Sequence, residues 1–165
     1  MKERQESRID RILQHELFRY HLEENRKAEA ERVFCHHDMN HFLDVARIGT
    51  ILDLEQELGL NREWIYAAAL LHDLGKHIQY ESGQPHELAS AEIAPKILAD
   101  CGFGAEEADL IVDAICNHRN AAIAESPDLR GVLYRADKAS RACFACAAEQ
   151  DCNWKGEKKN LTIKY

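Results

Sequence analysis

The chain has 165 residues, of which 45% are hydrophobic and 30% are charged, and its formal net charge is −8 at pH 7. This length and composition favour one globular domain over a disordered or fibrous chain. The negative charge argues against electrostatic binding to a nucleic-acid polymer or an anionic membrane. Because the first ten residues are mostly polar and no apolar run approaches the length of a bilayer span, we expect a cytoplasmic protein.

The pattern of apolar residues predicts an all-α fold, a single-domain bundle of about six or seven helices. Only three prolines and eight glycines interrupt the chain, and runs of β-branched residues are nearly absent. A first helix is predicted over residues 3–32, because the apolar residues at its start follow helical spacing. These residues are Ile9, Leu13, Leu17 and Tyr20.

In the middle of the chain, a second helix is predicted to end near Gly59. A third begins after Asn61, a residue suited to an N-terminal cap, and we expect Gly75 to close it. Residues 67–71 are apolar on every side of this helix, so it is expected to be central and buried. The stretch from 79 to 85 is the clearest predicted loop.

The second half of the chain contains helices predicted roughly over residues 86–100 and 105–117. A sixth helix is expected to start with Pro127 at its first helical position. A C-x-x-C pair, Cys143 and Cys146, is expected on a further short helix rich in alanine.

Histidines and carboxylates recur at the apolar faces or ends of five of these predicted helices. His41, for example, is continued by apolar residues at spacings of four, three and four, which places it on a buried face. One buried histidine is usually a hydrogen-bonded core residue, but a whole set in a small core is costly unless metal coordination compensates. The six candidate metal ligands are His41, His72, Asp73, His86, His118 and Asp137.

The adjacency of His72 and Asp73 suits a pair of metal ions. Successive helical residues diverge by about 100°, so the imidazole can bind one ion while the two-oxygen carboxylate bridges to a second. We expect His41 and Asp137 to complete the first ion's ligands. His86 and His118 would complete the second ion's ligands.

The segments HFLDVARIGTIL, AALLHDLGK and ADKASR resemble the HD superfamily of metal-dependent phosphohydrolases. The similarity covers about residues 33–141, between the first helix and a cysteine-containing extension at 142–165. The family's minimal pattern of a His, a His-Asp pair and a distal Asp falls on four of the six candidates: His41, His72, Asp73 and Asp137.

Two further features of the sequence narrow this resemblance. His86 and His118 are similar to the additional histidines of the dinuclear members, and the GYP signature of the cyclic-di-GMP phosphodiesterases is absent after HDLGK. The order of HDLGK, PHELAS, CNHRN and ADKASR is also similar to a bacterial branch that hydrolyses symmetrical dinucleoside tetraphosphates.

The resemblance implies two divalent ions, Fe or Mn, with Zn also compatible, and a bridging hydroxide that attacks a phosphate ester or anhydride of a small nucleotide-like substrate. It assigns catalytic roles to Asp73 and Lys76, and substrate-phosphate binding to Lys76, Arg119 and Arg141. The alternatives are a cation at a helix C-terminus for Lys76 and surface ion pairs for the arginines. No nucleic-acid polymer and no membrane are expected as partners.

Two sets of residues outside this pattern are also candidates for metal binding. His37 precedes His41 by one helical turn, and some family members bind a third metal at this offset; the alternative is a polar helix start. Three cysteines lie within ten residues, and with Cys35 they could hold Zn or an iron–sulfur cluster. A redox thiol pair and simple burial are the alternatives. The candidate thiolates are Cys35, Cys143, Cys146 and Cys152.

Two other function classes use the same residues. The first is a di-iron oxygenase resembling myo-inositol oxygenase, in which the metal centre activates O₂. The second is a non-enzymatic metal- or redox-sensing module with the cysteines as the sensor. Oxygen uptake would identify the oxygenase, and metal binding without turnover would identify the sensor.

Overall fold

The computed structural model describes residues 6–164, which contain no β-strand, so the predicted all-α fold is confirmed. The described residues form eight α-helices and three single-turn 3₁₀ helices. The α-helices are α1 (Arg8–Gln14), α2 (Glu16–Ala28), α3 (Met39–Glu55), α4 (Arg62–Leu71), α5 (Lys76–Ser82), α6 (His86–Asp100), α7 (Ala105–Asn117) and α8 (Leu129–Ala139). The 3₁₀ helices are η1 (Ala121–Ile123), η2 (Cys143–Ala145) and η3 (Gly156–Lys158). None of these helices is long and apolar enough to cross a membrane.

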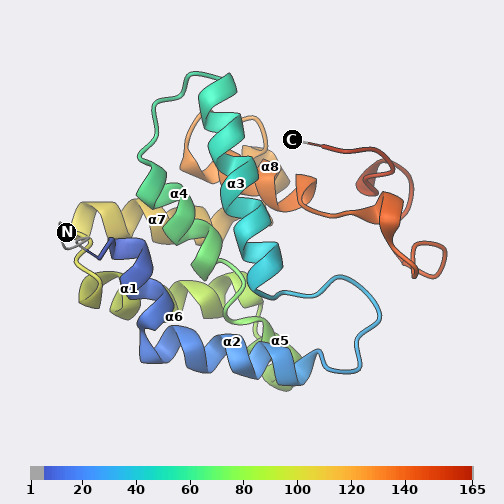
Figure 1. Ribbon diagram of the computed structural model, residues 1–165, viewed down its shortest axis with the longest axis horizontal. Helices are drawn as coiled ribbons and strands as arrows, with labels where there is room; N and C mark the ends of the chain where they lie inside the picture. The colour runs from blue at the N-terminus through green and yellow to red at the C-terminus, as the bar shows by residue number, and fades with distance from the viewer. Residues whose placement is uncertain (1–5, 165) are drawn as a thin grey trace, which may run out of the picture.

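Helix α4 lies at the centre of the bundle and contacts α1, α3, α6, α7 and α8 (Figure 1). All five residues from Ala67 to Leu71 are buried, as the apolar run predicts. The small alanine side chains let neighbouring helices approach α4 closely, so its C-terminal end reaches the middle of the molecule. Helices α6 and α7 pack as one pair, and α3 packs against both α4 and α8.

The first predicted helix is divided in two, and it ends earlier than expected. His15 has an extended backbone conformation (φ −65°, ψ 133°), so α1 stops at Gln14. The His15 side chain then accepts a hydrogen bond from the N–H of Leu17 and caps α2. This break turns the chain so that Ile12 and Phe18 both enter the core. The helix ends at Ala28, and the following segment to residue 38 is irregular.

The expected loop at 79–85 is wrong, because most of it belongs to a short helix. Helix α5 starts at Lys76 and continues to Ser82, and Gly83 ends it with a left-handed conformation (φ 80°). Gly75 therefore precedes α5 as its N-cap, and α4 has already ended at Leu71. His72 and Asp73 lie in the tight turn between these two helices.

Three other predicted boundaries also move. Helix α3 ends at Glu55 and not near Gly59, where the backbone is left-handed (φ 71°). Helix α8 begins at Leu129 because the Asp128 carboxylate caps it, so Pro127 lies outside the helix. The region around the C-x-x-C pair forms only the single turn η2, and no α-helix covers it.

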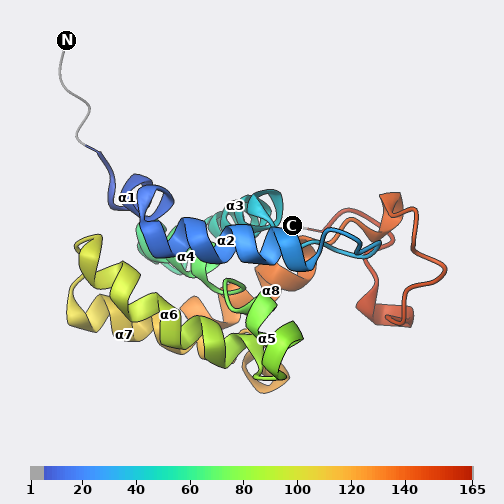
Figure 2. The same ribbon diagram turned by 90° about the horizontal axis from the view of Figure 1, so that it is seen from below.

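The predicted extension at 142–165 starts one residue earlier in the structure: residues 141–164, called the C-terminal extension from here on, leave the helical bundle after α8 (Figures 1 and 2). In both views it lies beside the irregular segment between α2 and α3. The two segments are far apart in the sequence, so this proximity is a result of the tertiary structure.

Candidate metal centre

The six predicted ligand residues converge from the ends of five structural elements. His41 lies in the first turn of α3, and His72 and Asp73 follow α4 directly. His86 is the first residue of α6, His118 follows α7, and Asp137 lies near the end of α8. Helix ends expose backbone groups that hold a side chain in place, which suits residues that need one fixed orientation.

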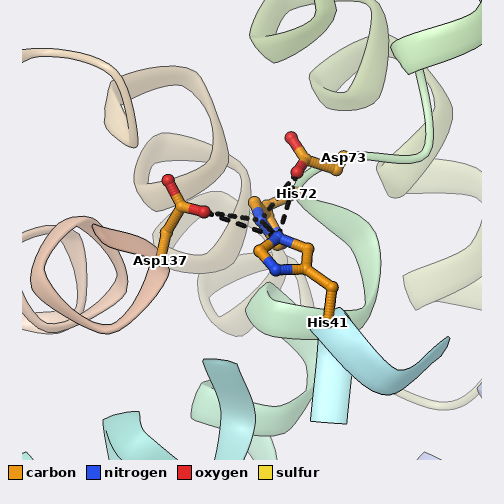
Figure 3. Close-up of side chains that lie close together, drawn as sticks. All are labelled: His41, His72, Asp73 and Asp137. Atoms are coloured by element: carbon orange, nitrogen blue, oxygen red, sulfur yellow. Dashed lines mark hydrogen bonds and ion pairs between the residues drawn. The ribbon is translucent and has the colours of Figure 1, made fainter. Parts of the chain in front are cut away.

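The first group consists of His41, His72, Asp73 and Asp137, whose ligand atoms all lie within 4.8 Å of one another. The Nε2 atoms of His41 and His72 are 3.3 Å apart. Asp73 Oδ2 lies 3.1 Å from the Nε2 atom of His72, and Asp137 Oδ1 lies 3.4 Å from that of His41. Figure 3 shows the two carboxylates on opposite sides of the imidazole pair.

The second group consists of Asp73, His86 and His118, whose ligand atoms also lie within 4.8 Å of one another. Here the other carboxylate oxygen, Asp73 Oδ1, lies 3.1 Å from His86 Nε2 and 3.3 Å from His118 Nε2. The two histidine Nε2 atoms are 3.2 Å apart. Asp73 is therefore shared, with one oxygen facing each group.

All four imidazoles present Nε2 to the centre because Nδ1 is engaged elsewhere. The Nδ1 atoms of His72 and His118 each lie 2.7 Å from a backbone carbonyl three residues earlier in the helix. That of His86 lies 2.5 Å from Gln79 Oε1, and that of His41 lies 3.3 Å from the Ser140 hydroxyl. Such outer contacts fix the tautomer and leave the Nε2 lone pair free for a metal.

The electrostatics of the centre also suit cations. Asp73 is buried, and among the described residues its Oδ1 has no hydrogen-bond donor. Burial alone would lower the pKa of His72, but Asp73 and Asp137 raise it to about 10. Carboxylates that attract a proton so strongly also attract a metal ion. The nitrogen and oxygen donors therefore fit a pair of divalent cations, with Mn, Fe and Zn all compatible.

The turn that carries His72 and Asp73 is supported from α2 by Asn25, which is fully buried. The Asn25 side-chain amide donates to the carbonyl of Asp73 at 2.9 Å, and its oxygen accepts from the N–H of His77 at 2.8 Å. Helix α2, which lies outside the predicted range of family resemblance, thus holds the centre of the site.

His37 lies at the site, but not in the way that its spacing predicts. Asp38 caps α3, so His37 precedes the helix and does not share a helical face with His41. Its Nδ1 lies 2.5 Å from the buried Glu29 carboxylate, and its Nε2 lies 3.9 Å from Asp73 Oδ2. Burial alone would raise the pKa of Glu29, but the hydrogen bonds from His37 and Tyr80 hold it at about 2. A third metal at His37 stays a prediction.

A cavity of about 760 Å³ opens over the centre, and five of the six candidate ligands line it: His41, Asp73, His86, His118 and Asp137. The three predicted phosphate-binding residues, Lys76, Arg119 and Arg141, all line it. Further lining residues are cationic or aromatic: Arg32, Lys138, Lys158, Phe34, Tyr134 and Trp154.

The cations of this cavity are held in different ways. Lys76 Nζ lies 3.4 Å from His86 Nδ1, and burial lowers the pKa of this lysine. Arg119 is half-exposed, with a 3.4 Å contact to Glu87. The Arg141 guanidinium stacks 3.8 Å from the ring centre of Trp154.

Several supporting residues were not identified from the sequence. Gln79 falls in the expected loop at 79–85, but it lies in α5 and its side chain orients His86. Glu29 and Asn25 lie in no quoted motif and Ser140 lies within ADKASR, but the roles of all three depend on contacts between segments that are distant in the sequence. Asn25 lies seven residues after Phe18 on the same face of α2, and a polar residue at that position is the signal in the sequence.

The comparison with known families agrees with this geometry. Residues 38–148 match the model of the HD domain, and this range contains all six candidate ligands. The chain belongs to the HD domain family. HD domains form a superfamily of metal-dependent phosphohydrolases, and the His/Asp cluster of this HD chain has the donors to bind metal.

Individual relatives of this HD domain protein fall into two groups. A Clostridium beijerinckii protein of uncharacterised function is 45% identical over 158 residues, which is 96% of this chain and 99% of that protein. Ribonuclease Y of Rubrobacter xylanophilus is 39% identical over 80 residues, or 48% of this chain and 14% of that protein. Ribonuclease Y of Mesoplasma florum is 34% identical over 86 residues, or 52% of this chain and 15% of that protein. No solved structure matches the chain.

Proposed function

We propose that this HD domain protein hydrolyses a phosphate ester or anhydride of a small, nucleotide-like substrate at a dinuclear metal centre. The observation that carries the proposal is the position of Asp73, whose two oxygens each face a separate pair of histidines. His41, His72 and Asp137 would hold one ion with Asp73, and His86 and His118 would hold the other. Such a pair of ions, when bound, supplies a hydroxide at neutral pH and neutralises charge on the phosphoryl oxygens.

Residues of the chain itself would bind the substrate phosphates. Lys76 lies beside His86, and its partial burial strengthens its attraction for a phosphoryl oxygen. Arg119 and Arg141 have the planar guanidinium group that binds phosphate through two parallel hydrogen bonds. Together they would orient the substrate with the scissile phosphate over Asp73.

The size and lining of the cavity support a nucleotide-like substrate. Its volume of about 760 Å³ is within the range of small-molecule sites. A base would stack on the faces of Trp154 and Tyr134 that Arg141 and Lys138 do not cover. In a nucleotide, the phosphate would contact the cationic residues of the cavity and the base would contact its aromatic residues.

The similarity to ribonuclease Y suggests RNA as an alternative substrate. The similarity covers about half of this chain and only 14% to 15% of those proteins. A net charge of −8 opposes binding to a polyanion. We therefore favour a small substrate and include an RNA oligonucleotide in the test.

The test combines metal analysis with a substrate panel. The purified protein is loaded anaerobically with Mn²⁺, Fe²⁺ or Zn²⁺ and assayed with nucleoside monophosphates, dinucleoside polyphosphates, a simple phosphate ester and an RNA oligonucleotide. We expect two metal ions bound at the His/Asp centre and hydrolysis of a small phosphate compound. Asp73→Asn should abolish turnover and reduce the metal content, whereas Asp109→Asn, on the exposed side of α7, should change neither.

Three outcomes would overturn the proposal. Full activity of metal-loaded Asp73→Asn would exclude the shared carboxylate from the reaction. Cleavage of the RNA oligonucleotide alone would replace the small substrate with a polymer. Substrate-dependent oxygen uptake by the ferrous protein, without phosphate release, would identify the oxygenase class instead.

A further inference from the structure

The C-terminal extension, residues 141–164, has almost no hydrophobic core of its own. Asn160 is its only buried residue, whereas Phe144, Leu161 and Ile163 are each at least half-exposed. Its regular structure is limited to the single turns η2 and η3. Segments that bury so little apolar surface generally need a disulfide or a metal to hold one conformation.

Polar contacts attach only parts of the extension. The side chain of Asn160 donates to the carbonyls of Lys138 and Arg141 at 2.7 and 3.0 Å, and its own carbonyl accepts from the N–H of Phe144. Lys159 binds the Glu149 carboxylate at 2.7 Å. These contacts anchor the extension to the end of α8, but none of them attaches it to the segment between α2 and α3.

Four of the six cysteines gather where these two segments meet. They line one cavity of about 310 Å³, and all are free thiols. Three come from the extension, and one comes from the segment between α2 and α3, 108 residues before the first of the others. The four are Cys35, Cys143, Cys146 and Cys152.

The thiols also influence one another electrostatically. Burial raises the pKa of Cys35, and the neighbouring Cys143 and Cys146 add to this effect, while Arg141 opposes it. Neighbouring thiolates repel one another, and a cation bound by them removes the repulsion. The other two cysteines lie elsewhere, with Cys101 buried at the end of α6 and Cys116 in α7.

We propose that Cys35, Cys143, Cys146 and Cys152 bind one structural Zn²⁺ ion. Zinc takes four thiolates in tetrahedral geometry, and a C-x-x-C pair is a frequent source of two of them. Each thiol gives up its proton on binding, so one Zn²⁺ replaces four protons and no oxidant or reductant is needed. The ion joins the extension to the segment between α2 and α3.

Binding would draw the four sulfur atoms together. Within residues 6–164, every group of three or more potential ligands whose donor atoms lie within 4.8 Å of one another belongs to the His/Asp centre. The four thiols form no such group, so their sulfur atoms are more widely spaced. The irregular backbone around η2 permits this closure. Metal affinity and folding of the extension are therefore coupled.

The zinc would also shape the cavity over the His/Asp centre. Cys143 and Cys152 line both cavities, and the extension supplies Arg141, Trp154 and Lys158 to the larger one. This consequence for substrate binding rests on the proposed function, whereas the zinc site itself does not.

The experiment measures zinc, iron and acid-labile sulfide in the full-length protein and in matched variants. We expect one more zinc per chain in the wild-type protein than in the double variant Cys143→Ser/Cys146→Ser. Cys116→Ser, which changes a cysteine outside the cluster, should keep the wild-type content. With Co²⁺ in place of zinc, the wild-type protein should show thiolate-to-cobalt charge-transfer absorption that the double variant lacks.

A second set of variants guards against simple misfolding. Cys152→Ala should lose the zinc, and Cys152→His should retain it because zinc also accepts three thiolates and one imidazole. Two results would contradict the proposed zinc site. One is an equal zinc content in the wild-type protein and the double variant, and the other is rapid alkylation of all four thiols in the zinc-loaded protein. Iron with stoichiometric sulfide would show that the cysteines bind an iron–sulfur cluster and not zinc. None of these measurements uses hydrolysis, so they can fail or succeed independently of the proposed function.

Discussion

The backbone N–H of Gly75 donates a 2.9 Å hydrogen bond to the hydroxyl of Ser90. This contact places α6 directly against the turn that carries His72 and Asp73. A Cβ atom at Gly75 would lie 2.6 Å from the Cβ atom of Ala89 and 2.7 Å from the backbone nitrogen of Ser90. The glycine of the HDLGK segment is therefore required by a close approach between two backbones, and that approach brings His86 to Asp73.

Gly75→Ala should consequently separate the two halves of the metal centre. Because backbone must move to accommodate the methyl group, we expect a loss of about 1–3 kcal/mol in the free energy of unfolding. We also expect weaker binding of the metal held by His86 and His118. Denaturant unfolding and elemental analysis measure both effects. Gly104→Ala is the matched control, because its added Cβ meets nothing closer than 3.6 Å. Wild-type stability and metal content in Gly75→Ala would contradict this prediction.

Asn25→Ala tests the support that α2 gives to the same turn. The substitution leaves the N–H of His77 without its buried partner, while the carbonyl of Asp73 keeps only the hydrogen bond from the N–H of Lys76. An unsatisfied buried polar group costs about 1–3 kcal/mol, and we expect a destabilisation in this range or above it. Thermal or denaturant unfolding provides the measurement. Asn40→Ala, at an exposed position of α3, should be nearly neutral; equal stability of the two variants would show that α2 does not support the turn.

Gln79→Ala tests the orientation of a single ligand. Loss of the Gln79 side chain frees the imidazole of His86 to rotate, because Nδ1 loses its 2.5 Å contact. Removing such an outer contact typically lowers metal affinity about 10-fold to 100-fold. Competition with a chelator of known affinity measures the change at each ion. We expect the weaker binding only at the ion held by His86, and no change for Gln84→Ala, whose side chain donates to the Glu92 carboxylate at 3.0 Å. Uniform weakening of both ions would argue against this role.

The acid stability of the protein should depend on an ion pair far from the metal centre. Hydrogen bonds from Arg8, Trp64 and the backbone of Gly104 hold the pKa of Glu107 at about 2, below its ordinary value of 4.5. Because the pKa of Glu107 is lower in the folded than in the unfolded protein, its ionised carboxylate stabilises the fold. This contribution is complete above about pH 4.5 and is lost as the pH falls toward 2.

Glu107→Gln should therefore be less stable than the wild-type protein at pH 7. It should also lose less stability between about pH 5 and pH 2, because the titrating group is gone. Thermal unfolding at a series of pH values measures the difference. Glu106→Gln is the neighbouring control at an exposed position. Parallel pH profiles of wild type and Glu107→Gln would show that α1 is not held to α4 and α7 through this carboxylate.

The sequence by itself determined the all-α class, most of the helices and the set of candidate ligands. These features are local, because apolar residues at helical spacing and a His or Asp on the same stripe can be identified within one segment. Helix ends were less predictable. The extended backbone of His15 and the helix from Lys76 to Ser82 both result from capping and packing that spacing alone does not specify.

That Asp73 bridges two ions could be proposed from the sequence, but only the tertiary structure decided which of its oxygens faces which histidines. That Asp73 Oδ1 faces His86 and His118 while Oδ2 faces His72 depends on the position of α6 against the turn after α4. The contacts of Asn25 and Gln79, and the proximity of Cys35 to the extension, likewise join segments far apart in the chain. Periodicity specifies which face of a helix is buried, but the crossing of two helices is set by side-chain packing between them. For that reason the ligands and their division between two ions could be proposed from the sequence, whereas the contacts between them required the fold.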